Sequence, residues 1–212
     1  MTVRLDRRLK TVLGMVRVQG RIADIGTDHA LLPCRLFQLG ATDIIATDIA
    51  DGPLERARAT VQLYGAESCV RLMKCDGLDK VPVRDDVIIA GMGGEMIAEI
   101  IARCEFLNPD LHFILQPMTR DFVLRKRLYE LGCGIEKEET AVVARKVYTV
   151  MLCRYTGVKR ETDLRFQFLG KNKDKEYLQK QITTLHKIGN SRSECEALAK
   201  ELEREKTWKE SP

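Results

Sequence analysis

The sequence lacks any long apolar run. It has 212 residues but no stretch of about 18 consecutive apolar residues, so it predicts no membrane-spanning helix. The first residues, MTVRLDRRLK, are basic and amphipathic and lack the apolar core of a secretory signal peptide, so we expect a cytoplasmic protein. At roughly 100–200 residues per domain, the length allows one full α/β domain and a modest appendage. The hydrophobic share of 44% suffices for a core.

Metal-binding spacings are also missing. The seven cysteines are odd in number, and no C-x-x-C pair or cluster of histidine and cysteine occurs. This usage is typical of reduced thiols in the core of a cytosolic protein, and we predict no metal site. Two of the three histidines, His112 and His186, stand isolated, and we expect them to be structural or solvated.

Several catalytic motifs are absent. The loop after the first expected strand lacks two of the three glycines of G-x-G-x-x-G, which argues against a pyrophosphate-binding loop and a nicotinamide-dependent oxidoreductase. No serine-hydrolase nucleophile elbow is present. The loop after the fourth strand has neither the Asn/Asp-Pro-Pro-aromatic run of amino-directed DNA methyltransferases nor the cysteine of cytosine C5 enzymes. The only Pro-Cys dipeptide, Pro33-Cys34, falls in an expected helix, where packing explains it.

The sequence does contain a regular alternation of short apolar runs and helical stretches over residues 21–117, which is typical of βαβ units and a parallel sheet. The runs Ile44–Ala46 and Val87–Ala90 are apolar without alternation, as strands buried on both faces should be. Expected strands are Arg21–Gly26, Asp43–Ile49, Val70–Asp76, Asp86–Gly91 and His112–Gln116, and expected helices lie near residues 5–14, 30–39, 53–64, 94–103 and 119–132.

The pattern changes after Gly134. Glu139–Ala144 and Val147–Arg154 are rich in Val, Thr and Tyr, and Arg145-Lys146 makes a polar break between them. These features predict an antiparallel pair that closes one edge of the sheet.

Strands are no longer expected from about residue 157. Leu164–Leu185 and Ser191–Lys206 predict two charged helices joined by Gly189-Asn190, and Ser191-x-x-Glu194 predicts a capping box. The second helix has a narrow apolar stripe, Cys195, Leu198 and Leu202, which suits an antiparallel helical hairpin. We therefore expect a catalytic domain over 1–156 and a helical hairpin over 157–212.

Acidic residues stand at the ends of three successive expected strands. Asp24 ends the first, and Gly26 lets the backbone turn closely under a ligand. Asp48 ends the second, where an acid accepts hydrogen bonds from ribose hydroxyls. Asp76 and Gly77 end the third, where an acid can meet an adenine amino group. Ligands bind outside the carboxyl ends of parallel strands, so the three acids predict one site for a cationic ligand such as S-adenosylmethionine (SAM), which carries a sulfonium and an amino group.

Two further segments belong to this neighbourhood. Ala90-Gly91-Met92-Gly93-Gly94 follows the fourth strand, and its glycines imply close approach of the backbone by a cofactor or a target base. Gln116-Pro117-Met118 ends the fifth strand, where simple turn chemistry explains the residues equally well.

Together these motifs resemble the bacterial tRNA (adenine(22)-N1)-methyltransferase family, often called TrmK. The resemblance covers nearly the whole chain, although the tail matches only in kind. The segments that carry it are LDRRL at 5–9, ADIGTDHA at 23–30, LP at 32–33, ATDI at 46–49, DGL at 76–78, AGMGG at 90–94 and LQP at 115–117. The segments at 23–30 and 90–94 are its specific parts, and those around Asp48 and Asp76 are shared by many methyltransferases.

The resemblance implies a Rossmann-like, seven-stranded class I methyltransferase sheet with a C-terminal helical, coiled-coil-like extension. It also implies transfer of a methyl group from SAM to N1 of adenine 22, in the D-arm region of tRNA. In that reading, the first loop holds the methionine end of SAM, Asp48 the ribose and Asp76 the adenine, while Arg8 reaches the SAM carboxylate. The residues matched to SAM are Arg8, Asp24, Gly26, Thr27, Asp28, His29, Asp48, Ile49, Asp76, Gly77, Gly91, Met92 and Gly93.

Methyl transfer to adenine N1 requires mainly that the two reacting groups are aligned. N1 of neutral adenine has a free lone pair, so the site has to hold that nitrogen in line with the sulfonium methyl group. An acceptor facing the exocyclic amino group would raise the nucleophilicity of N1. We assign Asp28 and His29 as candidate catalytic residues in a positioning role, with backbone carbonyls around Met92 as the alternative. A base in folded tRNA must be exposed or flipped before a pocket takes it.

Positive charge is concentrated in two segments. Residues 3–21 hold six Lys/Arg against one Asp, and residues 157–192 hold nine Lys/Arg against four Asp/Glu, whereas 194–210 hold six Glu against four Lys/Arg. The two basic segments suit phosphate contacts with tRNA, and an ordinary solvated helical face is the alternative. We expect the tail to grip the tRNA; the oligomeric state stays open, with a monomer favoured.

Two other functions remain open at this stage. A SAM methyltransferase acting on a small molecule or a protein would work without RNA and would tolerate removal of residues 157–212. A catalytically idle SAM-fold protein would bind RNA even after Asp24→Ala and would transfer no methyl group.

Overall fold

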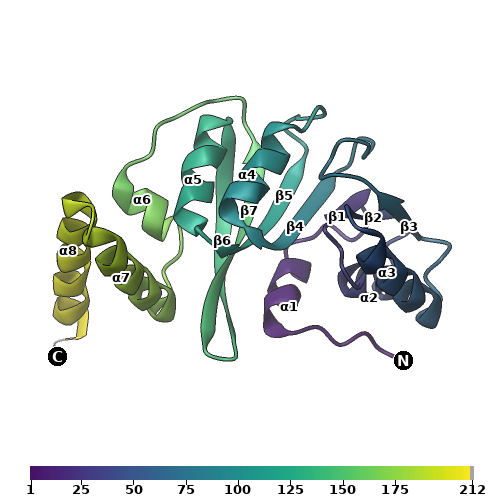
Figure 1. Cartoon of the computed structure of the whole chain (residues 1–212), viewed down its shortest axis with the longest axis horizontal. Helices are drawn as coiled ribbons and strands as arrows, with labels where there is room; N and C mark the ends of the chain where they lie inside the picture. The colour runs from purple at the N-terminus through teal and green to yellow at the C-terminus, as the bar shows by residue number, and fades with distance from the viewer. Residues whose placement is uncertain (211–212) are drawn as a thin grey trace.

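The computed structural model describes the backbone of residues 1–210 and the side chains of residues 1–206. Seven strands form one sheet in the order β3-β2-β1-β4-β5-β7-β6. Strands β1 to β5 are parallel, and β7 and β6 complete the sheet in antiparallel pairing (Figure 1). The strands are β1 (Ile22–Ile25), β2 (Ile44–Asp48), β3 (Val70–Lys74), β4 (Asp86–Gly93), β5 (His112–Thr119), β6 (Cys133–Val143) and β7 (Lys146–Tyr155).

Helices cover both faces of this sheet. Its alternate side chains divide into two apolar cores, one against α1, α2 and α3, the other against α4 and α5. On neighbouring residues of β4, for example, Ile88 belongs to the first core and Ile89 to the second, and both are fully buried. The five helices are α1 (Arg7–Leu13), α2 (Leu31–Gln38), α3 (Asp51–Leu63), α4 (Gly94–Ala102) and α5 (Asp121–Glu130). The sequence predictions of a parallel α/β sheet and of these helices are confirmed, with boundaries shifted by a few residues.

The antiparallel pair at the edge is longer than the sequence predicts. β6 begins at Cys133, six residues before the expected start at Glu139, because a register shift between Ile135 and Lys137 breaks the polar–apolar alternation of the strand. The turn lies at Ala144-Arg145, one residue earlier than expected. Both residues have left-handed backbone, with φ of 47° and 66°, which is the geometry of a two-residue type I′ hairpin.

The tail differs from the prediction in two places. The expected helix Leu164–Leu185 is broken into α6 (Leu164–Leu169) and α7 (Lys175–Gly189), because Gly170 leaves the helix with φ of 57° and the Asp174 carboxylate caps a new one. Helix α8 (Ser193–Glu210) starts two residues after Ser191, whose hydroxyl donates to the Ile188 carbonyl, so the expected capping box does not begin this helix. 

The predicted pairing of tail helices is confirmed. The stripe Cys195, Leu198 and Leu202 is buried against residues of α6 and α7, including Phe168 and Leu185. The three tail helices stand beyond β6, at the end of the molecule away from α2 and α3 (Figure 1). No described helix is long and apolar enough to cross a membrane, and the seven cysteines are free thiols.

A fully buried arginine joins the tail to the sheet. The Arg125 side chain on α5 and the Glu138 side chain on β6 are both inaccessible to solvent and lie 2.9 Å apart. The Arg125 Nη1 group donates to the carbonyls of Gln167 and Phe168 on α6, and its Nη2 donates to the Tyr177 hydroxyl on α7. Each N–H group of the guanidinium therefore has an acceptor, which a charge removed from water requires.

Gly170 completes this arrangement. A Cβ atom at this position would lie 2.0 Å from Glu138 Oε2 and 2.3 Å from Arg125 Nε, so only glycine fits beside the ion pair. Tyr177 in turn donates to Asp121, which also accepts hydrogen bonds from Lys180 and Gln181. The tail is thus fixed by buried polar contacts as well as by its own apolar core.

We expect Arg125→Met to lower the free energy of unfolding by about 3–5 kcal/mol, because it leaves the Glu138 carboxylate buried without its cation. The matched control is Arg127→Met on the same helix, which removes only a half-exposed pair with Glu130 and is expected to change stability by about 0.5 kcal/mol or less. Urea unfolding followed by circular dichroism measures both. Equal losses in the two variants would contradict a special role for the buried pair.

Candidate functional site

The carboxyl ends of the parallel strands meet at one edge of the sheet, as their register requires. Two cavities lie side by side at this edge and share Gly26 as a common lining residue. The first, of about 710 Å³, lies over the ends of β2 and β3, and the second, of about 460 Å³, lies over the ends of β1 and β4 beside α1. 

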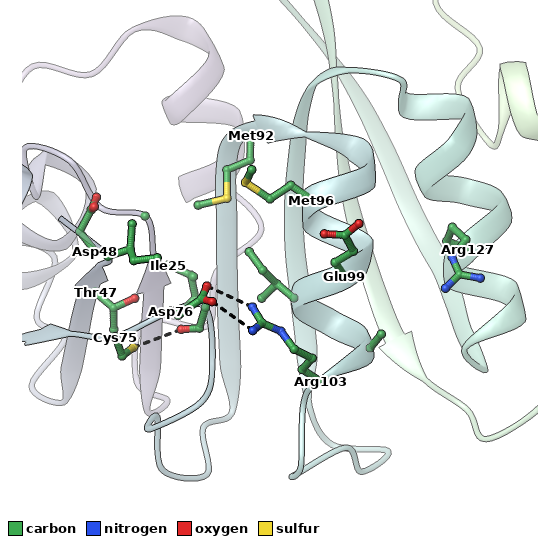
Figure 2. A pocket seen from close by; sticks show the side chains of 15 residues that line it. Ile25, Thr47, Asp48, Cys75, Asp76, Met92, Met96, Glu99, Arg103 and Arg127 are labelled. Carbon is green, nitrogen blue, oxygen red and sulfur yellow. Dashed lines mark hydrogen bonds and ion pairs between the residues drawn. The ribbon is translucent and has the colours of Figure 1, made fainter.

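The first cavity is lined by two of the three predicted acids. Asp48 and Ile49 come from the end of β2, and Asp76 and Gly77 follow β3. Figure 2 shows the Asp76 carboxylate facing the Arg103 guanidinium of the segment after α4. Both Arg103 Nη atoms lie 3.1 Å from the Asp76 oxygens, and this pairing holds the pKa of Asp76 below its ordinary value.

The second cavity contains the first predicted acid. Asp24 is 5% exposed, and its Oδ2 accepts a hydrogen bond from the Thr27 hydroxyl at 2.7 Å. Burial raises the pKa of Asp24 to about 6; the hydrogen bond from Thr27 lowers it and the Asp48 charge raises it. A buried carboxylate whose only side-chain partner is a neutral hydroxyl is a strong acceptor for a ligand cation.

The loop after β1 requires glycine at position 26. Its φ is 72°, and a Cβ atom there would lie 2.1 Å from the Met92 methyl carbon. Met92, which lines the first cavity, therefore lies directly over Gly26, and Figure 2 shows its side chain close to that of Met96. A ligand that extends through both cavities would pass this methionine.

A buried glutamine organises the loop after β4. Gln116 is fully buried, and its Oε1 accepts hydrogen bonds from the Gly91 backbone N–H at 3.2 Å and from Arg8 Nη1 at 2.5 Å. This amide fixes Arg8 beside Gly91 at the mouth of the second cavity. Turn chemistry alone, the alternative for Gln116-Pro117, accounts for none of these bonds.

Asp28 and His29 lie at the exposed rim of the second cavity. Asp28 pairs with Arg56 of α3 at 2.6 Å and approaches His29 Nε2 at 3.5 Å, and all three side chains are about half exposed. The Asp28 backbone N–H donates to Asp48 at 3.3 Å, which ties the loop after β1 to the end of β2. Asp28 thus contributes to the shape of the loop through its main chain.

The structure brings together all but one of the residues predicted for the cofactor. Gly93 lines neither cavity; it precedes the first residue of α4 and lies near the Thr119 hydroxyl. Sequence reasoning missed Arg103, which pairs with Asp76, and Arg56, which pairs with Asp28. Neither arginine stands in a motif, so no signal in the sequence identifies them.

The basic N-terminal segment is divided between two edges of the sheet. Arg17 and Arg21 lie at the amino edge, where they pair with Asp86 and Asp85. The expectation that the basic segment 3–21 suits phosphate contacts therefore does not extend to these two cations, which are neutralised far from the cavities. Arg4 and Arg8 do line the second cavity.

His112 and His186, expected to be structural or solvated, both contact acidic side chains away from the two cavities. His112 lies 4.0 Å from the buried Asp86 carboxylate at the start of β5. His186 on α7 contacts Glu196 and Glu203 of α8 at 2.9 and 3.0 Å. Neither lines the two cavities, and among the described residues no group of three or more potential ligands could hold a metal ion.

Comparison with known proteins gives consistent matches. A family model described as "Methyltransferase domain" matches residues 5–151. The tRNA (adenine(22)-N(1))-methyltransferase of Bacillus subtilis (strain 168) is 32% identical over 190 residues, which cover 84% of this chain and 80% of the relative. 

Solved structures extend the similarity to the tail. The crystal structure of the B. subtilis m1A22 tRNA methyltransferase TrmK superposes with a TM-score of 0.79 at 27% identity, covering 96% of each chain. A Streptococcus pneumoniae protein crystallised in complex with SAM gives a TM-score of 0.76 at 26% identity, covering 94% of this chain and 97% of that one. Coverage this high includes the three tail helices.

We expect Asp24→Asn to stabilise the ligand-free protein at pH 8 by up to about 3 kcal/mol, since its pKa rises from 3.8 to about 6 on folding. The folded state penalises the charged form, so the penalty is complete above pH 6 and disappears as the pH falls from 6 to 4. The gain should shrink over the same window. Urea unfolding at pH 4.5, 6 and 8 measures it, with the exposed Asp51→Asn as control; a pH-independent gain would contradict a raised pKa.

Proposed function

The chain belongs to the family of tRNA (adenine(22)-N1)-methyltransferases, and from this we propose that methyl transfer from SAM to N1 of an adenine in tRNA takes place at the carboxyl edge of its sheet. One observation carries the proposal: acids at the ends of three adjacent strands line two cavities that adjoin at Gly26. By family membership, the modified nucleotide is adenine 22 in the D-arm region.

The side chains at this edge fit SAM. Asp24 offers a buried carboxylate to the amino group of the methionine moiety, and Thr27 keeps that carboxylate oriented. Asp48 and Ile49 are placed to receive the ribose, because an acid at the end of the second strand accepts hydrogen bonds from vicinal hydroxyls. Asp76 and Gly77 then receive the adenine, and Arg103 holds the Asp76 carboxylate ionised for its amino group.

The chain has little acid–base chemistry to perform. SAM held by these acids would supply a sulfonium methyl group to the lone pair of adenine N1, and S-adenosylhomocysteine would be the leaving group. The task of the protein is alignment, which the loop after β4 performs by its fixed backbone: Gln116 holds the Gly91 N–H, and Arg8 lies against the same amide. Backbone carbonyls of this loop and the rim residues Asp28 and His29 are the candidate acceptors for the exocyclic amino group of the target.

We assign the tail a role in binding tRNA. Lys173, Lys175 and Lys187 are exposed on the tail, whereas Arg165 and Lys180 are engaged in ion pairs. Some of the excess positive charge over residues 157–192 is therefore neutralised by ion pairs within the protein, and the rest is available to bind phosphates. The proposed active unit is a monomer that works in the cytoplasm on tRNA, with a catalytic unit over 1–156 and a tRNA-binding unit over 157–212.

Incubation with radiolabelled SAM and unmodified tRNA should give label in 1-methyladenosine after digestion to nucleosides. Asp24→Ala should reduce the rate at least 100-fold, because it removes the acceptor for the cofactor amino group. Asp51→Asn, an exposed acid on α3, should leave the rate unchanged. Label in a protein or small molecule with none in tRNA would overturn the assignment, as would tRNA binding without any transfer.

The affinity for S-adenosylhomocysteine should depend on pH through Asp24. In the ligand-free protein this group has a pKa of about 6, and the bound ammonium requires it to be ionised. Binding must therefore expel a proton below pH 6, and the dissociation constant should rise about tenfold per pH unit from there. Isothermal titration calorimetry between pH 5 and 8 measures the slope. A slope that persists in Asp24→Asn would assign it to another group.

A further inference from the structure

A third cavity lies on the other side of the β6–β7 hairpin from α1. Its volume is about 930 Å³. The hairpin forms one wall, α7 forms the opposite wall, and the end of β5 forms the floor. The end of the hairpin is separate from β5, since the last β5–β7 pair joins Leu115 and Met151, whereas the pairing of β7 with β6 continues to Lys146. We call this cavity the hairpin groove. Its lining includes Met118, Arg145, Lys146, Tyr148, Glu176 and Thr183.

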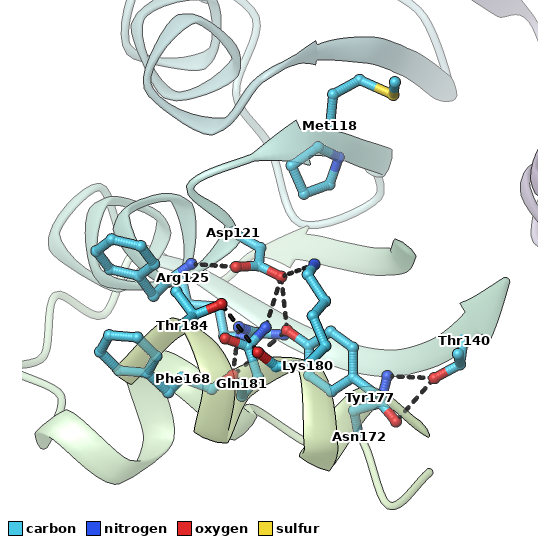
Figure 3. A network of polar contacts seen from close by, with 12 residues as sticks. Met118, Asp121, Arg125, Thr140, Phe168, Asn172, Tyr177, Lys180, Gln181 and Thr184 are labelled. Carbon is cyan, nitrogen blue, oxygen red and sulfur yellow. Dashed lines mark hydrogen bonds and ion pairs between the residues drawn. The ribbon is translucent and has the colours of Figure 1, made fainter. Parts of the chain in front are cut away.

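The groove adjoins the candidate active site. Met118, which follows Gln116 by two residues, lines both the second cavity and the hairpin groove. Figure 3 shows Met118 across from Lys180 and Tyr177, above the buried network around Asp121. A polymer whose target base enters the second cavity would therefore extend over Met118 into the groove.

Two cations at the hairpin tip have no partner of their own. Arg145 and Lys146 are exposed, and neither side chain makes a hydrogen bond or an ion pair with any residue that the structure describes. By contrast, Lys180 on the opposite wall is neutralised by Asp121 at 3.0 Å. Unpaired cations of this kind attract phosphate groups.

The remaining lining is suited to bases and sugars. Tyr148 and Val147 make an apolar surface beside the two cations, and Gln179 and Thr183 offer polar groups from α7. Glu176 on that same helix repels phosphate, so the charges of the two walls are unequal. The phosphates of an RNA strand in the groove are thereby directed to Arg145 and Lys146 at the hairpin tip, and its sugars and bases lie between Val147 and Tyr148 on one wall and Gln179 and Thr183 on the other.

We propose that the hairpin groove binds the single-stranded RNA segment next to the target adenosine, with Arg145 and Lys146 contacting its phosphates. The proposal rests on the tRNA methyltransferase function. It assigns the extended β6–β7 hairpin a part in the specificity for RNA, separate from the cofactor cavities and from the exposed lysines of the tail.

The test is the double variant Arg145→Asn/Lys146→Gln, in which asparagine tolerates the left-handed turn position. Its KM for tRNA should rise on the order of tenfold with an unchanged kcat, and the slope of log affinity against log salt should fall by about 1.4, at about 0.7 per phosphate. The matched control, Arg58→Gln/Arg71→Gln, removes two exposed cations from α3 and β3 and should match the wild type. Affinity for S-adenosylhomocysteine should be the same in all three proteins.

A photo-crosslinker at Val147, in the groove, should attach to tRNA on irradiation, whereas one at Leu63 on α3 should not. The proposal is overturned if the double variant and the control have equal tRNA affinities and equal salt slopes. Absence of 1-methyladenosine from the wild-type reaction would instead refute the proposed function. Equilibrium binding of tRNA, measured by fluorescence anisotropy, would then still report on the groove.

Discussion

The burial of one guanidinium constrains how the whole molecule is assembled. Arg125 has lost all contact with water, so each of its N–H groups must find an acceptor, and those acceptors come from β6, α6 and α7. The strand, the tail and α5 therefore have one mutual arrangement. This arrangement sets the distance between α7 and the hairpin, and with it the width of the groove between them. Removal of residues 157–212 would also delete the acceptors on α6 and α7 and expose the Arg125–Glu138 pair to water, so a truncated chain would lose more than the tail itself.

A second constraint acts at the carboxyl edge. Parallel pairing in register brings Asp24, Asp48 and Asp76 to the same side of the sheet, although they are about twenty-five residues apart in sequence. The three acids then have different environments: Asp24 is buried with a neutral partner, Asp48 holds the backbone of the neighbouring loop, and Asp76 is paired with Arg103. One residue type thus offers an acceptor with a raised pKa, a loop anchor and an acceptor with a lowered pKa.

The sequence predicts the features that depend on neighbouring residues, and it does not predict those that depend on contacts between distant segments. The strands and the acids at their ends are encoded by contiguous apolar runs, and twelve of the thirteen residues assigned to the cofactor line the two cavities. Interactions between distant segments were not predictable. Glu138 is a charged residue in a polar stretch of the sequence, where a strand residue is expected to be exposed. Its burial is explained only by its pairing with Arg125. The sequence predicts a continuous helix through Gly170 because the residues on either side have helical periodicity. The count of basic residues over 3–21 includes Arg17 and Arg21, whose partners Asp86 and Asp85 are distant in the sequence.

Among the described residues, the non-glycine positions with left-handed backbone are all in loops at the carboxyl edge. They are Asp28 and Ala30 after β1, Arg120 after β5, and Ala144 and Arg145 at the hairpin tip. Each such conformation costs about 1–2 kcal/mol in a non-glycine residue. The loops at this edge therefore contribute less to the free energy of unfolding than they would with glycine-compatible residues at these positions. Glycine or asparagine at these positions would relieve the strain, because both residues adopt the left-handed conformation at little cost. Substitutions that relieve backbone strain in this protein are therefore concentrated at the edge that carries the candidate site, where a gain in stability would also alter the loops that shape the cavities.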